Sequence, residues 1–267
     1  MTASPLAVTP ASARAEPTRP VFLPKEHGSW SLAFEPLALG LIVAPSAGGL
    51  PLAVATSAAF FSRRPLGAFL KADSTSPRAS RRLMALLLVC AGAGLGEAAI
   101  LGGTAAMWPL LICAPLVALF LYSDWRGESR AAESELAGSA AFAVLPVSFA
   151  TLAGWSPKTA LSLGAIMAAR SLPAVIAVRC AVRIGKRRAT RRLAPVAAAA
   201  AGFVLLAVLA ARNLIPVLTV GMGGVLAVCT AAMLVPRRVP FTPRKIGTIE
   251  AVLGVLYVLG SAYGYGF

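Results

Sequence analysis

The sequence predicts an all-α protein that crosses a membrane many times, built as one bundle of about nine transmembrane helices. Three observations support this fold class. Of the 267 residues, 58% are hydrophobic and only 13% are charged, whereas a soluble domain has roughly 25% charged residues. The mean hydropathy is +0.77. Finally, apolar stretches are separated by loops that are alternately rich and poor in Lys and Arg, as in multi-pass membrane proteins.

Nine stretches are candidates for crossing, because a spanning helix needs about 20 mostly apolar residues. Helices are expected since lipid cannot satisfy the backbone groups of an open sheet edge. The second stretch is short, and Pro51 at its start favours a tilted or re-entrant piece, although the charge pattern requires it to cross. The expected spans are 29–45, 49–62, 82–101, 105–123, 134–153, 158–182, 192–211, 214–235 and 246–265.

The basic loops predict the orientation. With these spans, the Lys and Arg residues before the first span and in every second loop share one side, and only Lys158 and Arg212 face the other. Short basic loops stay in the cytoplasm. The amino terminus is therefore expected on the cytoplasmic side of the membrane and the carboxyl terminus on the outer side. The net charge of +15 then serves topology and attraction to anionic lipid headgroups, and no motif indicates a nucleic-acid partner.

The domain organisation is expected to be simple. Residues 1–20, rich in Ala, Pro, Ser and Thr, are expected to form a disordered tail, and residues 21–267 a single transmembrane domain. The four cysteines lie far apart in apolar stretches, without the spacing of a zinc site or a redox pair. No metal and no cofactor is therefore expected.

Charges inside spans are the first candidates for function, because burying them in lipid is costly. Glu35, Glu97, Arg170 and Glu250 fall inside expected spans. Arg170 is the deepest and cannot lose its charge. It needs a carboxylate, several carbonyls or an anionic ligand, and an ion pair with Glu97 or Glu35 is as plausible as a ligand site.

A second set of candidates lies at the basic end. The end of the sixth span carries Arg179, Arg183, Lys186 and Arg187, whose spacings of three and four residues predict one cationic stripe. Guanidinium groups match phosphate oxygens, so the basic loops are candidates for holding a phosphate or diphosphate headgroup, unless they only fix the topology. The other candidate ligand-binding residues are Lys25, Arg63, Arg64, Lys71 and Arg126.

His27 is the single histidine of the chain and lies in the heptapeptide Pro24–Trp30. Its unperturbed pKa near neutrality suits a proton-handling role, so His27 and the neighbouring Glu26 are the candidate catalytic residues. No second histidine completes a metal site or a hydrolytic triad.

Small residues suggest close helix packing. Gly92 with Gly96, and Gly260 with Gly264, have the four-residue spacing that lets helices approach closely in membranes. We therefore expect the spans to pack as one bundle.

The heptapeptide Pro-Lys-Glu-His-Gly-Ser-Trp resembles the opening motif of the YwiC-like family of bacterial membrane proteins. The stretches Glu133–Gly138 and Pro243–Glu250 agree with that family, and the resemblance extends over about residues 21–262. It implies a membrane fold and a location in the bacterial inner membrane. It implies no activity, since the family has none assigned.

A weaker resemblance, carried by Leu121–Arg126, is to the UbiA superfamily of intramembrane prenyltransferases. It implies a nine-helix bundle with functional loops after helices two and six. That superfamily binds magnesium and an isoprenoid diphosphate through aspartate-rich motifs in those loops. This chain has only Asp73 in the first loop, and Arg179, Arg183 and Lys186 near the second, so metal-assisted prenyl transfer is not expected.

Three functions follow from these features. The first is a multi-pass protein that binds an isoprenoid or anionic lipid, with membrane lipids as partners, at a basic cytoplasmic face. The second is a divergent UbiA-like transferase acting on a lipid-linked substrate. The third is a small-solute transporter, in which Glu35, Glu97 and Arg170 line the path.

Overall fold

The computed structural model describes residues 27–70, 78–128, 131–235 and 241–266. Within them the backbone forms nine α-helices and one short 3-10 helix, η1 (Thr104–Met107). The α-helices are α1 (His27–Val43), α2 (Gly49–Leu70), α3 (Arg78–Gly102), α4 (Pro109–Trp125), α5 (Ala132–Leu152), α6 (Pro157–Gly185), α7 (Leu193–Ala211), α8 (Val217–Met233) and α9 (Pro243–Gly264).

The all-α prediction is confirmed, and each of the expected spans coincides with one of these helices. The main difference is α2, which is a continuous helix of 22 residues instead of a short segment ending at residue 62. Pro51 lies in its first turn, where a residue without an amide hydrogen costs little. At about 1.5 Å per residue, α2 is long enough to traverse a bilayer.

The hydropathy of the helices indicates a multi-pass membrane protein. Among the described residues, six helical segments are long and apolar enough to cross a membrane, namely α3, η1 with α4, α5, α6, α7 and α9. The helices α1 and α8 contain shorter apolar stretches. The number of crossings and their direction are taken up below as proposals.

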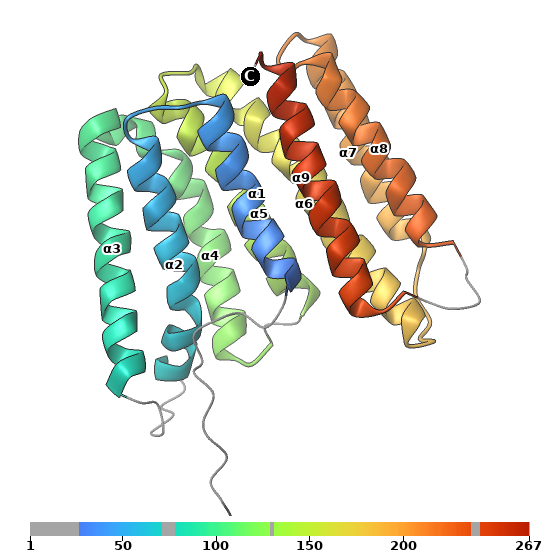
Figure 1. Ribbon diagram of the computed structural model, residues 1–267, viewed down its shortest axis with the longest axis horizontal. Helices are drawn as coiled ribbons and strands as arrows, with labels where there is room; N and C mark the ends of the chain where they lie inside the picture. Colours follow the sequence, from blue (N-terminus) through green and yellow to red (C-terminus); the bar gives the residue numbers. More distant parts are fainter. Residues whose placement is uncertain (1–26, 71–77, 129–130, 236–240, 267) are drawn as a thin grey trace, which may run out of the picture.

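The helices α5 and α6 form the centre of the bundle. The helix α5 packs against α1, α4 and α6, and α6 packs against α7, α8 and α9. Figure 1 shows the pair α2 and α3 on one flank and the pair α7 and α8 on the other. Most of α5 and α6 is buried, whereas α3, α4 and α7 are largely exposed, as expected for helices that face lipid.

Glycines allow the closest helix contacts. A β-carbon on Gly40 of α1 would overlap the ring of Phe149 of α5, and one on Gly164 of α6 would lie 2.5 Å from Val147. The predicted packing role of Gly260 and Gly264 is confirmed, since both lie against residues of α8 or of the turn before it. The prediction for Gly92 and Gly96 is wrong, because neither has a neighbouring atom within 4 Å of a built β-carbon.

Consecutive helices run in opposite directions (Figure 1). The first residue of α1, the last residue of α2 and the first residue of α3 therefore lie at one end of the bundle, and this alternation continues to the first residue of α9. We call this end the basic end. Lys158, at the start of α6, and Arg212, after the last residue of α7, lie at the opposite end.

Candidate functional site

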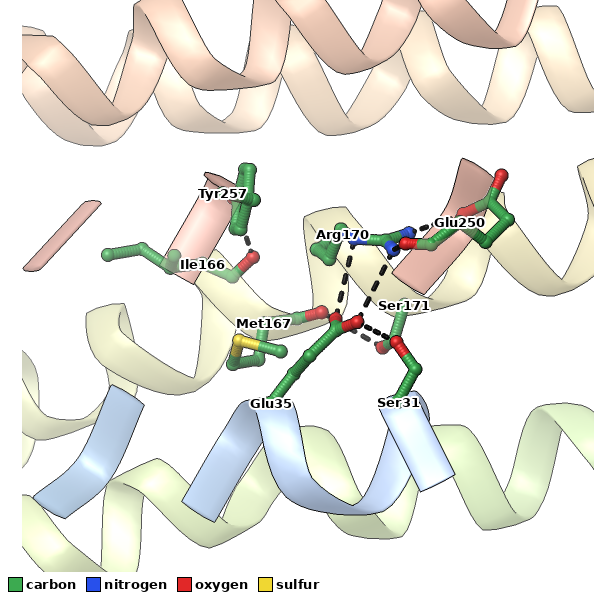
Figure 2. Close-up of polar contacts among 8 residues, drawn as sticks. All are labelled: Ser31, Glu35, Ile166, Met167, Arg170, Ser171, Glu250 and Tyr257. Atoms are coloured by element: carbon green, nitrogen blue, oxygen red, sulfur yellow. Dashed lines mark hydrogen bonds and ion pairs between the residues drawn. The ribbon is translucent and has the colours of Figure 1, made fainter. Parts of the chain in front are cut away.

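Arg170 of α6 lies in the core of the bundle between α1 and α9 (Figure 2). Its Nη1 is 2.9 Å from Oε2 of Glu250, and its Nη2 donates to the backbone carbonyl of Glu250 at 2.7 Å. On the other side, Nη2 is 3.5 Å from Oε1 of Glu35, and Nε is 3.4 Å from Oε2 of the same residue. Two glutamates on distant helices thus share one arginine.

This Glu35–Arg170–Glu250 triad is buried. The exposed fractions of the three residues are 5%, 3% and 8%. Charged groups at such depth are retained only with partners, and here the partners come from three helices that are far apart in the sequence. The triad therefore ties α1, α6 and α9 together at mid-length.

The carboxyl of Glu35 is held by its own helix and by α9. The hydroxyl of Ser31, one turn earlier on α1, donates to Oε1 of Glu35 (Figure 2). On the α9 side, a β-carbon at Gly254 would overlap this carboxyl group. The absence of a side chain at position 254 is therefore what allows the Glu35 carboxyl to reach Arg170.

The sequence alone left the partner of Arg170 open. The ion pair with Glu35 is one of the predicted alternatives, and Glu250 is a partner that was not predicted. Glu250 and Gly254 are four residues apart and therefore lie on one face of α9. This spacing is the sequence feature that could have placed both residues on the same side of the helix. Glu97 lies elsewhere, exposed on α3, where it lines a surface depression between α2 and α3 of about 510 Å³.

Two of the predicted phosphate-binding arginines are paired with carboxylates. Arg63 of α2 is 3.7 Å from Asp124 of α4, and its guanidinium lies 4.2 Å from the centre of the Phe120 ring. Arg179 of α6 donates to Glu135 of α5 at 2.6 Å. These ion pairs join neighbouring helices near the basic end. They also engage guanidinium N–H groups that an anionic ligand would need.

Arg126 follows α4 and is exposed. Its Nε lies 3.6 Å from Glu128, and its Nη1 donates to the hydroxyl of Tyr122 at 3.2 Å. Because all its partners are near in sequence, this cluster orients the Arg126 side chain without joining helices.

Eight further cations form an exposed cluster, which we call the basic surface. It combines the end of α6, the connection to α7 and the start of α9, and no described carboxylate lies within ion-pair distance of its members. The end of α6 and the start of α9 are adjacent, since Ile246 of α9 packs with Cys180 and Ala181 of α6 in one apolar cluster. The basic surface consists of Arg183, Lys186, Arg187, Arg188, Arg191, Arg192, Arg244 and Lys245.

The backbone of Arg187 is unusual. Its φ of 54° is in the left-handed region, which L residues other than glycine and asparagine rarely adopt. The turn ends α6, with the Arg187 amide donating to Ile184 and the Arg188 amide donating to Arg183, each at 2.9 Å. Glycine is the usual residue at this position of a helix end, so the chain keeps a cation here at a conformational cost.

The remaining predicted site residues are only partly described. His27 begins α1, and Arg64 lies in α2, but their side chains are outside the described part of the structure. Lys25, Glu26 and Lys71 lie outside the described residues. One turn after His27, Trp30 contacts Phe61 of α2 with ring centres 5.4 Å apart. The beginning of α1 is therefore next to the basic end of α2.

Part of the chain matches a known protein family. Residues 23–150 match the family model described as YwiC-like protein. The chain is YwiC-like over residues 23–150. The YwiC-like region includes α1 to α4 and nearly all of α5, and thus Glu35, Arg63 and Asp124. Arg170, Glu250 and the basic surface lie beyond it. No curated protein and no solved structure matches the chain.

Proposed function

We propose that this YwiC-like protein crosses a bacterial inner membrane nine times, with its basic end in the cytoplasm, and that the basic surface binds an anionic, phosphate-bearing lipid. The observation that carries the proposal is the set of eight exposed cations without a described carboxylate partner. Each Lys or Arg near an anionic membrane surface contributes about 1 kcal/mol to the attraction. The set is therefore expected to draw anionic headgroups to this end of the bundle.

The ion pairs of Arg63 and Arg179 restrict where on the basic end a lipid headgroup would bind. Arg63 and Arg179 already donate to Asp124 and Glu135, so a headgroup at those positions would have to displace a carboxylate. The α6–α7 connection and the start of α9 carry no such competition among the described residues. Arg183 and Lys186 are the two predicted ligand-binding residues that belong to this surface.

The strained backbone at Arg187 also supports a role for this surface. Residues held in unfavourable backbone conformations tend to occur at functional positions. An arginine in place of the favoured glycine adds a guanidinium next to Arg188. The cost of the left-handed conformation is then offset by phosphate binding.

Native mass spectrometry of the purified protein tests this proposal. The protein is reconstituted with phosphatidylglycerol or phosphatidylcholine in separate samples, and an isoprenoid diphosphate is offered in a third. We expect retained phosphatidylglycerol, and a loss of at least about ten-fold when Arg187, Arg188, Arg191 and Arg192 are replaced by Ala. Preference for the isoprenoid diphosphate would identify the ligand as an isoprenoid instead of a bulk lipid.

The matched control replaces the cations of the opposite end. The variant Lys158→Ala/Arg212→Ala also lowers the positive charge of the chain but leaves the basic surface intact, so we expect unchanged retention. Equal retention of phosphatidylglycerol and phosphatidylcholine by the unmodified protein would show the lipid-binding proposal to be wrong.

A small-solute transporter is the second candidate, and the buried Glu35–Arg170–Glu250 triad favours it, because ionisable groups inside a membrane bundle often mark a transport path. Glu97 lies away from the triad, so a path would use α1, α6 and α9. The UbiA-like transferase with His27 and Glu26 as catalytic residues remains a prediction. Among the described residues, no group of three or more His, Cys, Asp or Glu is placed to hold a metal ion.

A further inference from the structure

The charges of the Glu35–Arg170–Glu250 triad do not balance when both carboxyl groups are ionised. Two carboxylates then face one guanidinium, which stays protonated at any accessible pH. All three residues are more than nine-tenths buried. An uncompensated charge at this depth costs several kcal/mol, and a single proton on one carboxyl group removes it.

The contact distances identify the carboxyl group that takes the proton. Arg170 holds Glu250 by a 2.9 Å contact to its carboxylate and a 2.7 Å bond to its backbone carbonyl. Its contacts to Glu35 are longer, at 3.4 and 3.5 Å. Oε2 of Glu35 and Nε of Arg170 are also both buried without a hydrogen-bond partner among the described residues. Glu250 is therefore the closer ion-pair partner of Arg170, and Glu35 is the carboxyl group that Arg170 holds less closely, with the Ser31 hydroxyl as its other partner.

We propose that Glu35 is a proton-binding residue and that the triad is a proton site in the core of the bundle. An oxygen of the Glu35 carboxylate takes a proton from a hydronium ion of the solvent, which leaves as water, and gives it back to a water molecule on release. In each direction one O–H bond breaks as another forms, and no other bond changes. The proposal is independent of lipid binding at the basic surface, since it concerns different residues and a different ligand.

The groups around Glu35 agree with a single proton. Arg170 from α6 and Glu250 and Tyr257 from α9 are the titratable groups that face it. The Tyr257 hydroxyl donates to the Ile166 carbonyl at 2.9 Å and is thus engaged elsewhere (Figure 2). The helices α2 and α5 also pack against α1, but no described charged group on them contacts Glu35. One proton on Glu35 therefore balances the charges of the described groups that face it.

A small cavity gives water a place beside the triad. It has a volume of about 10 Å³ and is lined by Arg170, Glu250 and Thr230, together with apolar residues of α6 to α9. This volume is about that needed for one water molecule, and polar groups on its wall provide partners. Thr230 of α8 adds a hydroxyl group to the wall of this cavity.

Infrared spectroscopy of the protein in lipid nanodiscs tests the proposal. At pH 7 we expect the C=O band of a protonated carboxylic acid, with the shift on transfer to deuterated water that an O–H group gives. Glu35→Gln should abolish this band, and Ser31→Ala should shift it without abolishing it, because the Ser31 hydroxyl contacts the Glu35 carboxyl. A folded wild-type protein without the band, or a Glu35→Gln variant that keeps it, would overturn the proposal.

Two controls separate the proton site from general effects. Glu97→Gln changes an exposed carboxyl and should leave the band unchanged. Ser171→Ala should also leave it unchanged, because the Ser171 hydroxyl donates to the Met167 carbonyl. Glu250→Gln should also abolish the band, because Arg170 then becomes the ion partner of Glu35 and ionises it.

Stability supplies a second, independent readout. Glutamine resembles protonated glutamic acid in shape and charge, so Glu35→Gln should unfold at nearly the same detergent concentration as the wild type. Glu250→Gln should be clearly less stable, since Arg170 loses its 2.9 Å ion pair with Glu250 and keeps only the longer contacts to Glu35. Equal destabilisation by the two variants would mean that Glu35 is ionised, and the proposal would be wrong.

Discussion

The carboxyl group of Glu35 on α1 lies directly against the backbone of Gly254 on α9, in the space that a β-carbon at position 254 would take. This contact makes the position of the triad depend on a residue that has no side chain. Overpacking a buried contact typically costs about 1–3 kcal/mol. We therefore expect Gly254→Ala to lower the free energy of unfolding by about that amount, measured by detergent-induced unfolding.

Gly247 provides the control within the same helix. A β-carbon there has no neighbouring atom within 4 Å, and alanine favours a helix over glycine by up to about 1 kcal/mol. Gly247→Ala should be neutral or slightly stabilising. If both glycine variants behaved alike, the contact between Glu35 and Gly254 would not contribute to stability.

Removal of the central cation should be more damaging. Arg170→Met leaves two buried carboxyl groups without an ion partner, and breaking a buried charge network by removing one member costs about 3–5 kcal/mol. The triple variant Glu35→Leu/Arg170→Met/Glu250→Leu removes all three ionisable side chains and should recover much of this loss, because apolar residues of similar size often replace a buried ion network without cost. Unfolding in detergent compares the two variants with the wild type. A triple variant no more stable than the single one would contradict this view of the triad.

Replacing Arg187 by glycine should raise the stability of the protein and lower its binding of anionic lipid. Glycine adopts a φ of 54° without the steric cost of about 1–2 kcal/mol that an L residue bears. Arg187→Gly should therefore stabilise the protein by about 1 kcal/mol while reducing retained anionic lipid. Asn213→Gly, at a φ of 56°, is the comparison, and it should gain less, because asparagine tolerates this region. Loss of stability in Arg187→Gly would show that its side chain has a packing role.

Much of the fold could be predicted because membrane helices depend on composition more than on detailed packing. The apolar stretches located each helix, and the alternating charge of the loops agrees with the antiparallel course of the bundle. The end of α2 was placed too early because Arg63 and Arg64 interrupt the apolar pattern. The structure shows how the helix accommodates Arg63, through the carboxylate of Asp124 and the ring of Phe120.

The candidate site was predictable only in part, because pairing across distant helices depends on rotation and depth. Sequence position identified Arg170, Glu35 and Glu250 as buried charges, but not that Glu250 forms the closer contact. Likewise, the periodicity of the sequence could not reveal that Arg63 forms an ion pair with Asp124. Nor could it reveal the ion pair of Arg179 with Glu135. The basic surface includes the predicted residues Arg183 and Lys186, which lie where the helices end and have no described carboxylate within ion-pair distance.

Gly94 is a further case in which spacing was misleading. The spacing of Gly92 and Gly96 indicated a packing face, yet the contact is made by Gly94, where a β-carbon would lie 2.6 Å from the carbonyl oxygen of Pro51 on α2. Because a backbone atom cannot move aside, Gly94→Ala should destabilise the protein by about 1–3 kcal/mol. Gly96→Ala should have little effect. Thermal unfolding in detergent distinguishes the two, and equal stability would argue against close α2–α3 contact.

The orientation in the membrane can be tested at both ends of the bundle. Arg188 lies at the basic end and Arg212 at the opposite end, so labelling of Arg188→Cys and Arg212→Cys on intact cells compares the two sides. The native cysteines lie within helices, and the unsubstituted chain serves as the control. Because short basic loops remain in the cytoplasm, a membrane-impermeant maleimide should label Arg212→Cys on intact cells. Arg188→Cys should react only after permeabilisation. Labelling of Arg188→Cys on intact cells would place the basic surface outside, away from the anionic cytoplasmic leaflet, and the proposed lipid site would lose its electrostatic basis.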